Sequence, residues 1–371
     1  MTGRVLVAMS GGVDSSVAAA RLVARGFETV GVTLHLWDYP DDGSVKGRCC
    51  APEDVYDARR VADQLGIAHY TFDRRELFAK EVVAPFVDAY LDGTTPSPCT
   101  RCNRGVKMRE LLALADRFDA DAVATGHYAR IDRQGSVPRL RRAADLAKDQ
   151  SYFLYTLDRA SLSRLVFPLG DATKQDVRSE AVALDLPGAH KGESQELCFV
   201  PTGRYDEFVA ARADERARPG PIVDEAGRTV GTHDGLFRFT VGQRKNLGVA
   251  VGHRAYVTSL DPATRTVHLG TRESLMARRA ELSDVTLAEG VELPLRADVV
   301  VRYRAKPMAA RVVASAGRPI EVTFDEPVAA VVPGQVAVFY DGDVVLGGGT
   351  IATSAARTAE PRTRSDAEAA P

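Results

Sequence analysis

The chain has 371 residues, of which 45% are hydrophobic and 26% charged, so it is long enough for two or three domains with buried cores and is not disordered throughout. Its net charge of −2 excludes a polybasic nucleic-acid coat but leaves room for a local basic patch. No run of about 18 apolar residues and no signal-peptide pattern occurs, so we expect a soluble, cytoplasmic protein with no membrane partner. Five cysteines, an odd number, predict metal binding or thiol chemistry rather than a disulfide framework.

The first 200 residues alternate strand and helix patterns. A buried strand at 5–9, a glycine turn, a helix and a second strand at 29–35 predict a βαβ unit. The patterns that follow predict helices and strands in turn over 52–65, 68–72, 76–90, 105–118 and 122–125. This alternation is typical of the α/β class, with a Rossmann-like parallel sheet covered on both faces.

The pattern changes near residue 205. A helix over 205–216 and short β-prone runs separated by Gly, Asp and Pro predict a small mixed middle domain. From residue 276 the runs alternate and are bounded by turns, which predicts an antiparallel β-barrel. The last residues lack large apolar side chains and predict a disordered tail. We therefore expect a catalytic domain, a middle domain, a barrel and a tail over 1–204, 205–275, 276–353 and 354–371.

The glycine turn after the first strand has the sequence SGGVDS, residues 10–15. Paired glycines let backbone N–H groups approach an anion, serine hydroxyls add donors, and a helix N-terminus favours negative charge. The turn lacks the lysine of GxxxxGK[ST] and is not GxGxxG, which argues against a P-loop NTPase and against dinucleotide binding. The plainer alternative is a tight turn with no ligand, but the complete pattern at this junction favours a phosphate site.

The turn resembles the PP-loop of the N-type ATP pyrophosphatases. That resemblance implies that ATP binds here and that an acceptor oxygen attacks its α-phosphorus. It places ATP contacts at Ala8, Met9, Ser10, Gly11, Gly12, Val13, Asp14, Ser15, Leu34 and Gly126. Asp14 is expected to hold Mg²⁺, a hard cation that prefers carboxylate and phosphate oxygens. Leu34 also fits a core residue that ends a buried strand.

Cysteines occur in two further motifs: Cys99 and Cys102 in SPCTRCN, and Cys198 in GESQELCFVP. A C-x₂-C pair alone fits redox chemistry, half of a zinc site, part of an iron–sulfur site or no function. The adjacent Cys49 and Cys50 have poor geometry for completing a tetrahedral zinc site, and we assign them no role.

Six motifs in order, SGGVDS, SPCTRCN, TGHYAR, KDQSYFLY, GESQELCFVP and FTVGQRKNLGV, resemble those of the bacterial tRNA-specific 2-thiouridylases over nearly the whole chain. The resemblance implies that ATP adenylates O2 of the wobble uridine, position 34, of tRNAs for Lys, Glu and Gln. Sulfur then displaces AMP, because adenylation turns a poor leaving group into a good one. Cys102 would be the nucleophile and Cys198 the persulfide carrier, the two joining in a transient disulfide, and we expect both in mobile loops. The sulfur would come from a persulfide donor such as a cysteine desulfurase or a relay protein.

One motif departs from the family. Many members have Asn-Pro-Asp where this chain has Ser97-Pro98-Cys99. A thiol can shuttle a proton but carries no permanent negative charge at neutral pH. Cys99 is therefore expected to be a proton shuttle or, with Cys102 and Cys198, a ligand of an iron–sulfur cluster in a cluster-dependent thiolase.

The resemblance also places contacts with tRNA or its target base at Ser97, Pro98, Cys99, His127, Lys148, Asp149, Gln150, Arg302, Tyr303 and Gln335. Residues 302–306 interleave an aromatic ring with basic side chains, which suits phosphate and stacking contacts, although a solvated barrel face is the plainer alternative. Arg244 and Lys245 fit either ligand contacts or surface charge. Two other function classes stay open: an argininosuccinate-synthase-like ligase, which needs no persulfide, and a non-catalytic RNA-binding protein.

Overall fold

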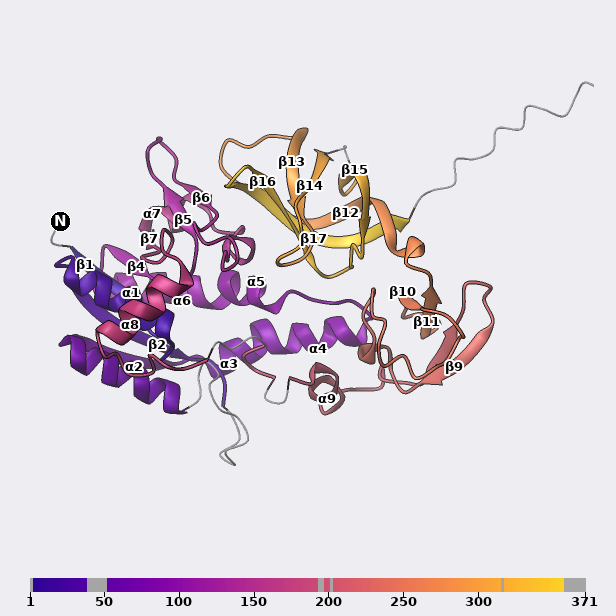
Figure 1. The fold of residues 1–371 in the computed structure, drawn as a ribbon, viewed down its shortest axis with the longest axis horizontal. Coiled ribbons are helices and arrows are strands. Elements are labelled where there is room, and N and C mark those ends of the chain that lie inside the picture. Colours follow the sequence, from indigo (N-terminus) through magenta and orange to yellow (C-terminus); the bar gives the residue numbers. More distant parts are fainter. Residues whose placement is uncertain (1–2, 39–51, 193–196, 201–202, 315–316, 357–371) are drawn as a thin grey trace, which may run out of the picture.

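The computed structural model describes residues 3–38, 52–192, 197–200, 203–314 and 317–356. Cys49 and Cys50 lie outside the described residues, as does most of the predicted tail, residues 357–371. Figure 1 shows three parts: an α/β part that holds the N-terminus, a barrel above it in the later colours, and a smaller β part beside the barrel.

A parallel sheet forms the centre of the α/β part. It has the order β3-β2-β1-β4-β7, made by β3 (Ala68–Asp73), β2 (Glu28–His35), β1 (Arg4–Ala8), β4 (Ala122–Ala124) and β7 (Leu165–Val166). Every neighbouring pair is parallel, so the predicted Rossmann-like sheet is confirmed.

Helices cover both faces of this sheet because successive side chains of a strand point to opposite sides. Val5 and Val7 of β1 pack in one apolar cluster with α1 (Val13–Ala24), α2 (Pro52–Leu65) and α8 (Lys174–Ala183). Leu6 between them packs in a second cluster with α6 (Met108–Arg117) and α7 (Arg159–Arg164).

Two of the predicted helices contain a wider π-helical turn. The helix predicted over 76–90 is α3 (Arg75–Phe78), a π turn (Ala79–Val83) and α4 (Ala84–Leu91). Pro85 lacks the N–H that a regular helix uses, and a wider turn beside it accommodates the missing bond.

The helix predicted from residue 105 begins earlier, at α5 (Pro98–Cys102), and continues through a π turn (Asn103–Lys107) into α6. Pro98 occupies the first helical position, where its fixed φ favours helix initiation. Cys102 is therefore helical, and the expectation of a mobile loop around it is wrong.

The middle part is small and mixed, as predicted. After α9 (Tyr205–Ala210), four strands have the order β10-β11-β8-β9, made by β10 (Tyr256–Asp261), β11 (Thr266–Gly270), β8 (Gly220–Val223) and β9 (Thr229–His233). β8 pairs with β11 in parallel and with β9 antiparallel. Helix α9 ends at Ala210, before the predicted residue 216. Arg216, beyond the helix, forms ion pairs with Asp88 and Asp92 at the end of α4.

The C-terminal part is a closed antiparallel barrel, which confirms the prediction. Its six strands are β12 (Met276–Leu287), β15 (Ile320–Ala329), β14 (Met308–Val313), β13 (Leu295–Val300), β16 (Val336–Asp341) and β17 (Val344–Ala356). Pairing between β12 and β17 closes the circle. Strand β17 continues to Ala356, past residue 353 at which the barrel was expected to end.

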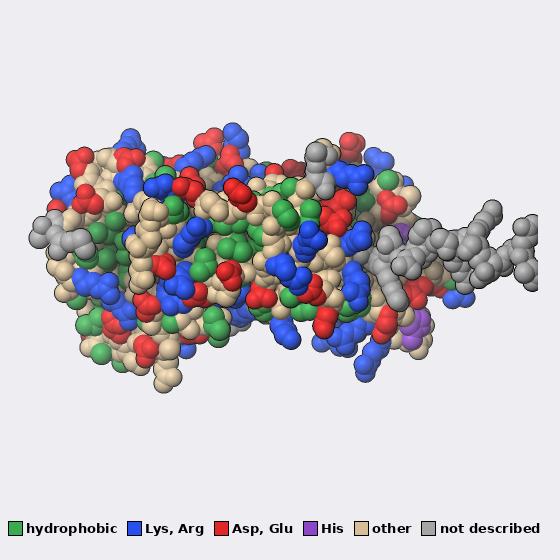
Figure 2. Space-filling model, turned by 90° about the horizontal axis from the view of Figure 1, so that it is seen from above, with side chains coloured by type: hydrophobic (Ala, Val, Ile, Leu, Met, Phe, Trp, Pro, Cys, Tyr) green, Lys and Arg blue, Asp and Glu red, His purple; other side chains and the backbone are tan. Residues whose placement is uncertain are grey.

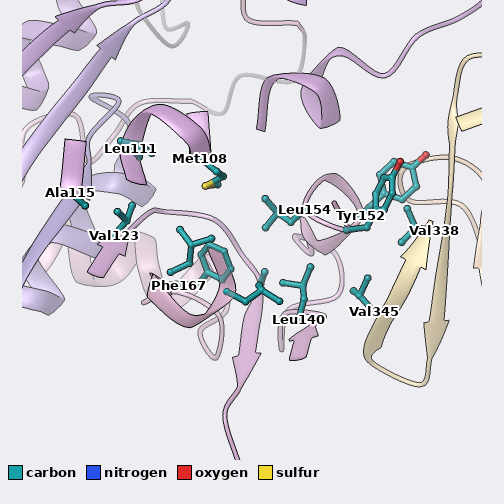
Figure 3. Close-up of a cluster of buried hydrophobic side chains, with 14 of the residues drawn as sticks. Met108, Leu111, Ala115, Val123, Leu140, Tyr152, Leu154, Phe167, Val338 and Val345 are labelled. Carbon is teal, nitrogen blue, oxygen red and sulfur yellow. The ribbon is translucent and has the colours of Figure 1, made fainter. Parts of the chain in front are cut away.

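The barrel and the α/β part share one core. Figure 3 shows Met108 and Leu111 of α6 and Val123 of β4 in one buried cluster with Val338 and Val345 of the barrel. The hairpin of β5 (Arg130–Asp132) and β6 (Arg139–Arg141) also adds to the edge of β17. A shared core and a shared sheet edge fix the position of the barrel against the parallel sheet.

Among the described residues, no helix is both long and apolar enough to cross a membrane.

Candidate active site

A cavity of about 740 Å³ lies where the α/β part, the start of the middle part and the barrel meet. It joins four predicted motifs: the SGGVDS turn, the SPC segment, the KDQ segment and the basic turn of the barrel. The predicted residues that line it are Ser10, Gly12, Val13, Asp14, Ser97, Pro98, Cys99, Lys148, Gln150, Tyr303 and Gln335.

The SGGVDS turn connects the end of β1 to the start of α1. Gly11 has a φ of +72°, and a Cβ there would lie 2.1 Å from the backbone oxygen of Asp54, so no other residue fits. The backbone N–H of Ser10 and the hydroxyl of Ser15 are 3.1 Å apart, and that hydroxyl donates to the carbonyl of Gly12 at 3.0 Å. The turn is thus held open at a helix N-terminus, where an anion is favoured.

The other predicted ATP residues lie behind this turn or beside it. Met9 and Ser15 are buried, and Ala8 packs in the cluster under the sheet. Gly126 follows β4 and contacts the backbone of Asp14 and Ser15. Leu34 packs between two apolar clusters at the end of β2. These residues support the turn from the carboxyl edge of the sheet, where ligands of open α/β sheets bind.

Asp14 is held by two partners that the sequence did not predict. Lys174, at the start of α8, donates to both carboxylate oxygens at 2.6 and 2.8 Å, and the Tyr128 hydroxyl donates to one of them at 2.8 Å. The Lys174 side chain is only 11% exposed and lines the cavity. The fold therefore supplies, from 160 residues away, the cation that the turn itself lacks.

Lys191 is a second cation on the cavity wall that the sequence did not predict. It forms ion pairs with Asp54 and Asp57 in the first turns of α2. Burial alone would lower the pKa of Lys191, but hydrogen bonds and the charges of the two aspartates raise it. Lys191 stands directly before the predicted GESQELCFVP motif, but no predicted motif or element marked Lys174.

The three described cysteines differ in environment. Cys99 is exposed in the first turn of α5 and lines the cavity, while Cys102 is 5% exposed. Cys198 is partly buried and packs against the apolar cluster that contains Cys102. Burial raises the pKa of the Cys102 thiol, an effect that the charge of Lys107 partly offsets. The structure thus brings Cys102 and Cys198 to one cluster and places Cys99 on the cavity side.

Two residues of the KDQ segment have structural partners. Asp149 is buried, and its carboxylate accepts from the backbone of Ala143 and from the hydroxyl of Ser151, so its place is that of a loop anchor. Gln150 lines the cavity, and its side-chain oxygen accepts from the backbone of Tyr128 at 2.9 Å. Gln150 therefore connects this segment to the residue that holds Asp14.

His127 is half-buried and is not one of the residues that line the cavity. Its Nδ1 is 2.7 Å from the Thr125 hydroxyl. Burial, with a smaller effect of the Lys107 charge, lowers the pKa of His127 to about 3. The imidazole is therefore neutral at physiological pH, and no sequence pattern could have fixed this.

The basic turn of the barrel lies between β13 and β14. Tyr303 packs with its ring centroid 4.5 Å from that of Phe153, so half of its surface is used inside the protein. Arg302 and Arg304 are exposed, and Arg304 lines the cavity with a φ of +62°, a strained value for arginine. Figure 2 shows basic and acidic side chains mixed over the visible face, so positive charge gathers locally and not over a whole face.

Three of the residues weighed as RNA contacts lie elsewhere or have another partner. Arg244 and Lys245 are exposed in a loop of the middle part, and Gln335 donates to backbone carbonyls of the catalytic domain.

A metal site needs several ligating side chains close together. Within residues 3–38, 52–192, 197–200, 203–314 and 317–356, no three His, Cys, Asp or Glu side chains gather in a way that could hold a metal ion. The described arrangement of Cys99, Cys102 and Cys198 therefore does not fit a cluster site. The carboxylate of Asp14 is of the kind that binds Mg²⁺ together with phosphate oxygens. In this structure both of its oxygens accept from Lys174.

Comparisons with known proteins cover most of the chain. Family models match residues 3–202 (tRNA methyl transferase HUP domain), 206–271 (tRNA methyl transferase PRC-barrel domain) and 276–351 (aminomethyltransferase beta-barrel domain). The chain is 60% identical, over 94% of its length and 92% of the relative, to a protein of Sorangium cellulosum named tRNA-specific 2-thiouridylase MnmA. It is 49% identical, over 94% of its length and 98% of the relative, to one of Solibacter usitatus with the same name. A 4-thiouridine synthetase in an RNA complex with bound ATP is similar over 57% of this chain and 50% of that one, at 15% identity and a TM-score of 0.34.

Proposed function

The chain belongs to the family of tRNA-specific 2-thiouridylases, and on this basis we propose that it converts the wobble uridine, position 34, of tRNA to 2-thiouridine with ATP as the activating substrate. The observation that carries the proposal is the single cavity that joins the SGGVDS turn to the SPC segment and to the barrel. An enzyme that activates a base with ATP and then adds sulfur to it needs these parts within reach of one nucleotide.

The phosphate end of the cavity performs the activation. The ATP phosphates bind the N–H groups of the SGGVDS turn, and Lys174 supplies positive charge beside them. O2 of the uracil attacks the α-phosphorus, the bond to the bridging oxygen breaks, and pyrophosphate leaves. Asp14 is the residue that would hold Mg²⁺, whose chemistry is to neutralise charge on the phosphates.

The cysteine end performs the sulfur transfer. Cys198 carries the persulfide, whose outer sulfur attacks C2 of the activated base so that AMP leaves. The Cys102 thiolate then attacks the Sγ of Cys198, which forms the Cys102–Cys198 disulfide and releases the sulfur on C2 as 2-thiouridine. An external thiol reduces the disulfide afterwards. The common apolar cluster of Cys102 and Cys198 supports this pairing.

Extrusion of the base explains the size of the cavity. A wobble base must leave the anticodon stack to reach both ends, and flipped bases are held by stacking and by edge contacts. Lys148 and Gln150 on one side and Tyr303 and Arg304 on the other line the space between the two ends. Persulfide is delivered by a donor protein, such as a cysteine desulfurase or a relay protein, on the side of Cys198.

Nucleoside mass spectrometry tests the proposal. The wild-type protein, incubated with ATP, tRNA and a persulfide donor, forms 2-thiouridine, and Cys102→Ala lowers its rate by at least about 1,000-fold. Cys102→Ala still releases pyrophosphate from ATP in the presence of tRNA, because the phosphate end is intact. Full activity of Cys198→Ala would contradict the persulfide route and favour a ligase of the argininosuccinate-synthase type.

A further inference from the structure

Gln335 and the barrel turn around it contact the catalytic domain directly before the cysteine helix α5. We infer that this turn, residues 333–335, is a positioning element that fixes the SPC segment, and that Gln335 acts through this contact and not chiefly as an RNA ligand.

Three hydrogen bonds join the turn to the catalytic domain. The side-chain amide of Gln335 donates to the carbonyl of Thr95 at 3.0 Å and to that of Pro96 at 3.1 Å. In return, the backbone N–H of Thr95 donates to the carbonyl of Pro333 at 2.9 Å. Residues about 240 apart in the chain are thus connected by two side-chain-to-backbone bonds and one backbone bond, which hold Thr95 and Pro96.

The backbones of Gly334 and Thr95 lie too close together for a side chain at residue 334. Gly334 has a φ of +90°, and a Cβ there would lie 2.8 Å from the oxygen of Thr95 and 2.9 Å from its nitrogen. Only glycine gives this fit. The turn is itself anchored in the barrel wall, because Gly334 donates to the carbonyl of Ile351 and the N–H of Ile351 donates to Gln335, both at 2.8 Å.

The segment that receives these contacts, residues 92–97, is not part of a helix or strand. It connects α4, which ends at Leu91, to α5, which begins at Pro98, and has no regular structure of its own. Pro96 and Pro98 have no N–H to donate, so the stretch lacks two of the bonds that a helix or strand would form. Thr94 donates to Ala89 of α4, and Arg101 of α5 donates to Ser97. Gln335, Pro96, Ser97 and Cys99 all line the cavity, so the barrel turn sets where the start of α5 faces it.

This assignment differs from an RNA contact in its chemistry. A glutamine amide has two N–H donors, and both carbonyls that they reach belong to the protein. The barrel would then act on the reaction without tRNA, by ordering the segment that carries Cys99 and begins the helix of Cys102.

Hydrogen exchange and thiol alkylation without tRNA or ATP test the inference. Gln335→Met keeps the length of the side chain but removes its donors. We expect about tenfold faster exchange of the Thr95 amide and a several-fold change in the rate at which iodoacetamide alkylates Cys99, both read by peptide mass spectrometry. Gln64→Met is the matched control, because Gln64 also donates to a backbone carbonyl, that of Leu184, but on α2. It should change neither rate.

A second variant and a wild-type measurement keep the test decisive. Gly334→Ala should release the Thr95 amide in the same way, and in the wild type the Thr95 and Ile351 amides should exchange at similar rates because they open together. Unchanged exchange and alkylation in Gln335→Met, with or without weaker tRNA binding, would overturn the inference. Since no tRNA or ATP is present, the outcome does not depend on whether the proposed function holds.

Discussion

The cavity has two walls that are built differently. The catalytic wall holds its charges in pairs at the carboxyl edge of the sheet, with Lys174 on Asp14 and Lys191 on Asp54. The barrel wall presents an exposed Arg304 and a half-buried Tyr303 on a turn. Paired, buried groups are fixed before a ligand arrives, whereas exposed basic groups bind phosphates with a strong dependence on salt. We therefore expect mutations in the catalytic wall to change the ATP chemistry and mutations in the barrel wall to change RNA binding.

Lys174→Met is the sharpest test of the catalytic wall. It removes the cation beside the SGGVDS turn and leaves Asp14 with the Tyr128 hydroxyl as its remaining described donor. We expect tRNA-dependent AMP formation to fall about 100-fold, the loss typical of removing one fixed charge-stabilising group. Release of labelled AMP from α-labelled ATP measures the effect.

The control for this change is Lys80→Met, because Lys80 is exposed on the π turn between α3 and α4. It should leave AMP formation unchanged, and tRNA affinity should be the same in both variants. If Lys174→Met lowered tRNA affinity by the same factor as AMP formation, ATP chemistry and RNA binding would not be separated between the two walls.

The catalytic wall contains one feature that the sequence predicted, the SGGVDS turn, and one that it did not, Lys174. The SGGVDS turn was predictable because its chemistry lies in six adjacent residues between a strand and a helix. Lys174 was not, because its contact with Asp14 joins residues 160 apart and depends on how α8 packs beside α1. The class of the sheet was predictable from strand and helix alternation, but its strand order was not predicted. The contact of Gln335 with Thr95 depends on the docked barrel.

The cysteine segment was misjudged for a local reason. Two prolines near Cys99 indicated a loop, but a proline at the first position of a helix starts it. The resulting helix buries Cys102, so the nucleophile role that we propose for it requires the thiol to become accessible during the reaction. Burial depends on the cluster formed with Phe78, Phe86 and Phe199, which the sequence around Cys102 does not reveal.

Arg302→Glu tests the barrel wall from the other side. Arg302 is exposed in the basic turn, and reversing its charge adds repulsion to any phosphate bound there. We expect tRNA affinity to fall about tenfold and the slope of log affinity against log salt to decrease in magnitude by about 0.7 to 0.9, the loss of one phosphate contact. Filter binding at several salt concentrations measures both.

The ATP-binding affinity of Arg302→Glu should equal that of the wild type, because Arg302 is not one of the residues that line the cavity. Arg318→Glu, another reversal of a basic charge in the barrel but away from the cavity lining, is the control and should retain the wild-type salt slope. If Arg302→Glu kept the wild-type slope of log affinity against log salt, Arg302 would belong to a solvated barrel face and not to an RNA contact.

His127→Gln has the smallest expected effect and tests whether the catalytic wall contains a titrating base. The pKa of His127 is about 3 in the folded protein and near 6.5 in the unfolded chain, so the neutral ring favours folding above pH 6.5. That contribution is lost as the pH falls from 6.5 towards 3, by at most about 1.4 kcal/mol per pH unit. Urea unfolding at pH 7.5, 6.0 and 5.0 should therefore show a shallower decline in the free energy of unfolding for the glutamine variant.

The rate of thiolation should keep its wild-type pH profile between 6 and 8, since a ring that is neutral throughout this range gains no proton there. Loss of an acid limb near pH 6.5 in the variant would instead assign the titrating base to His127.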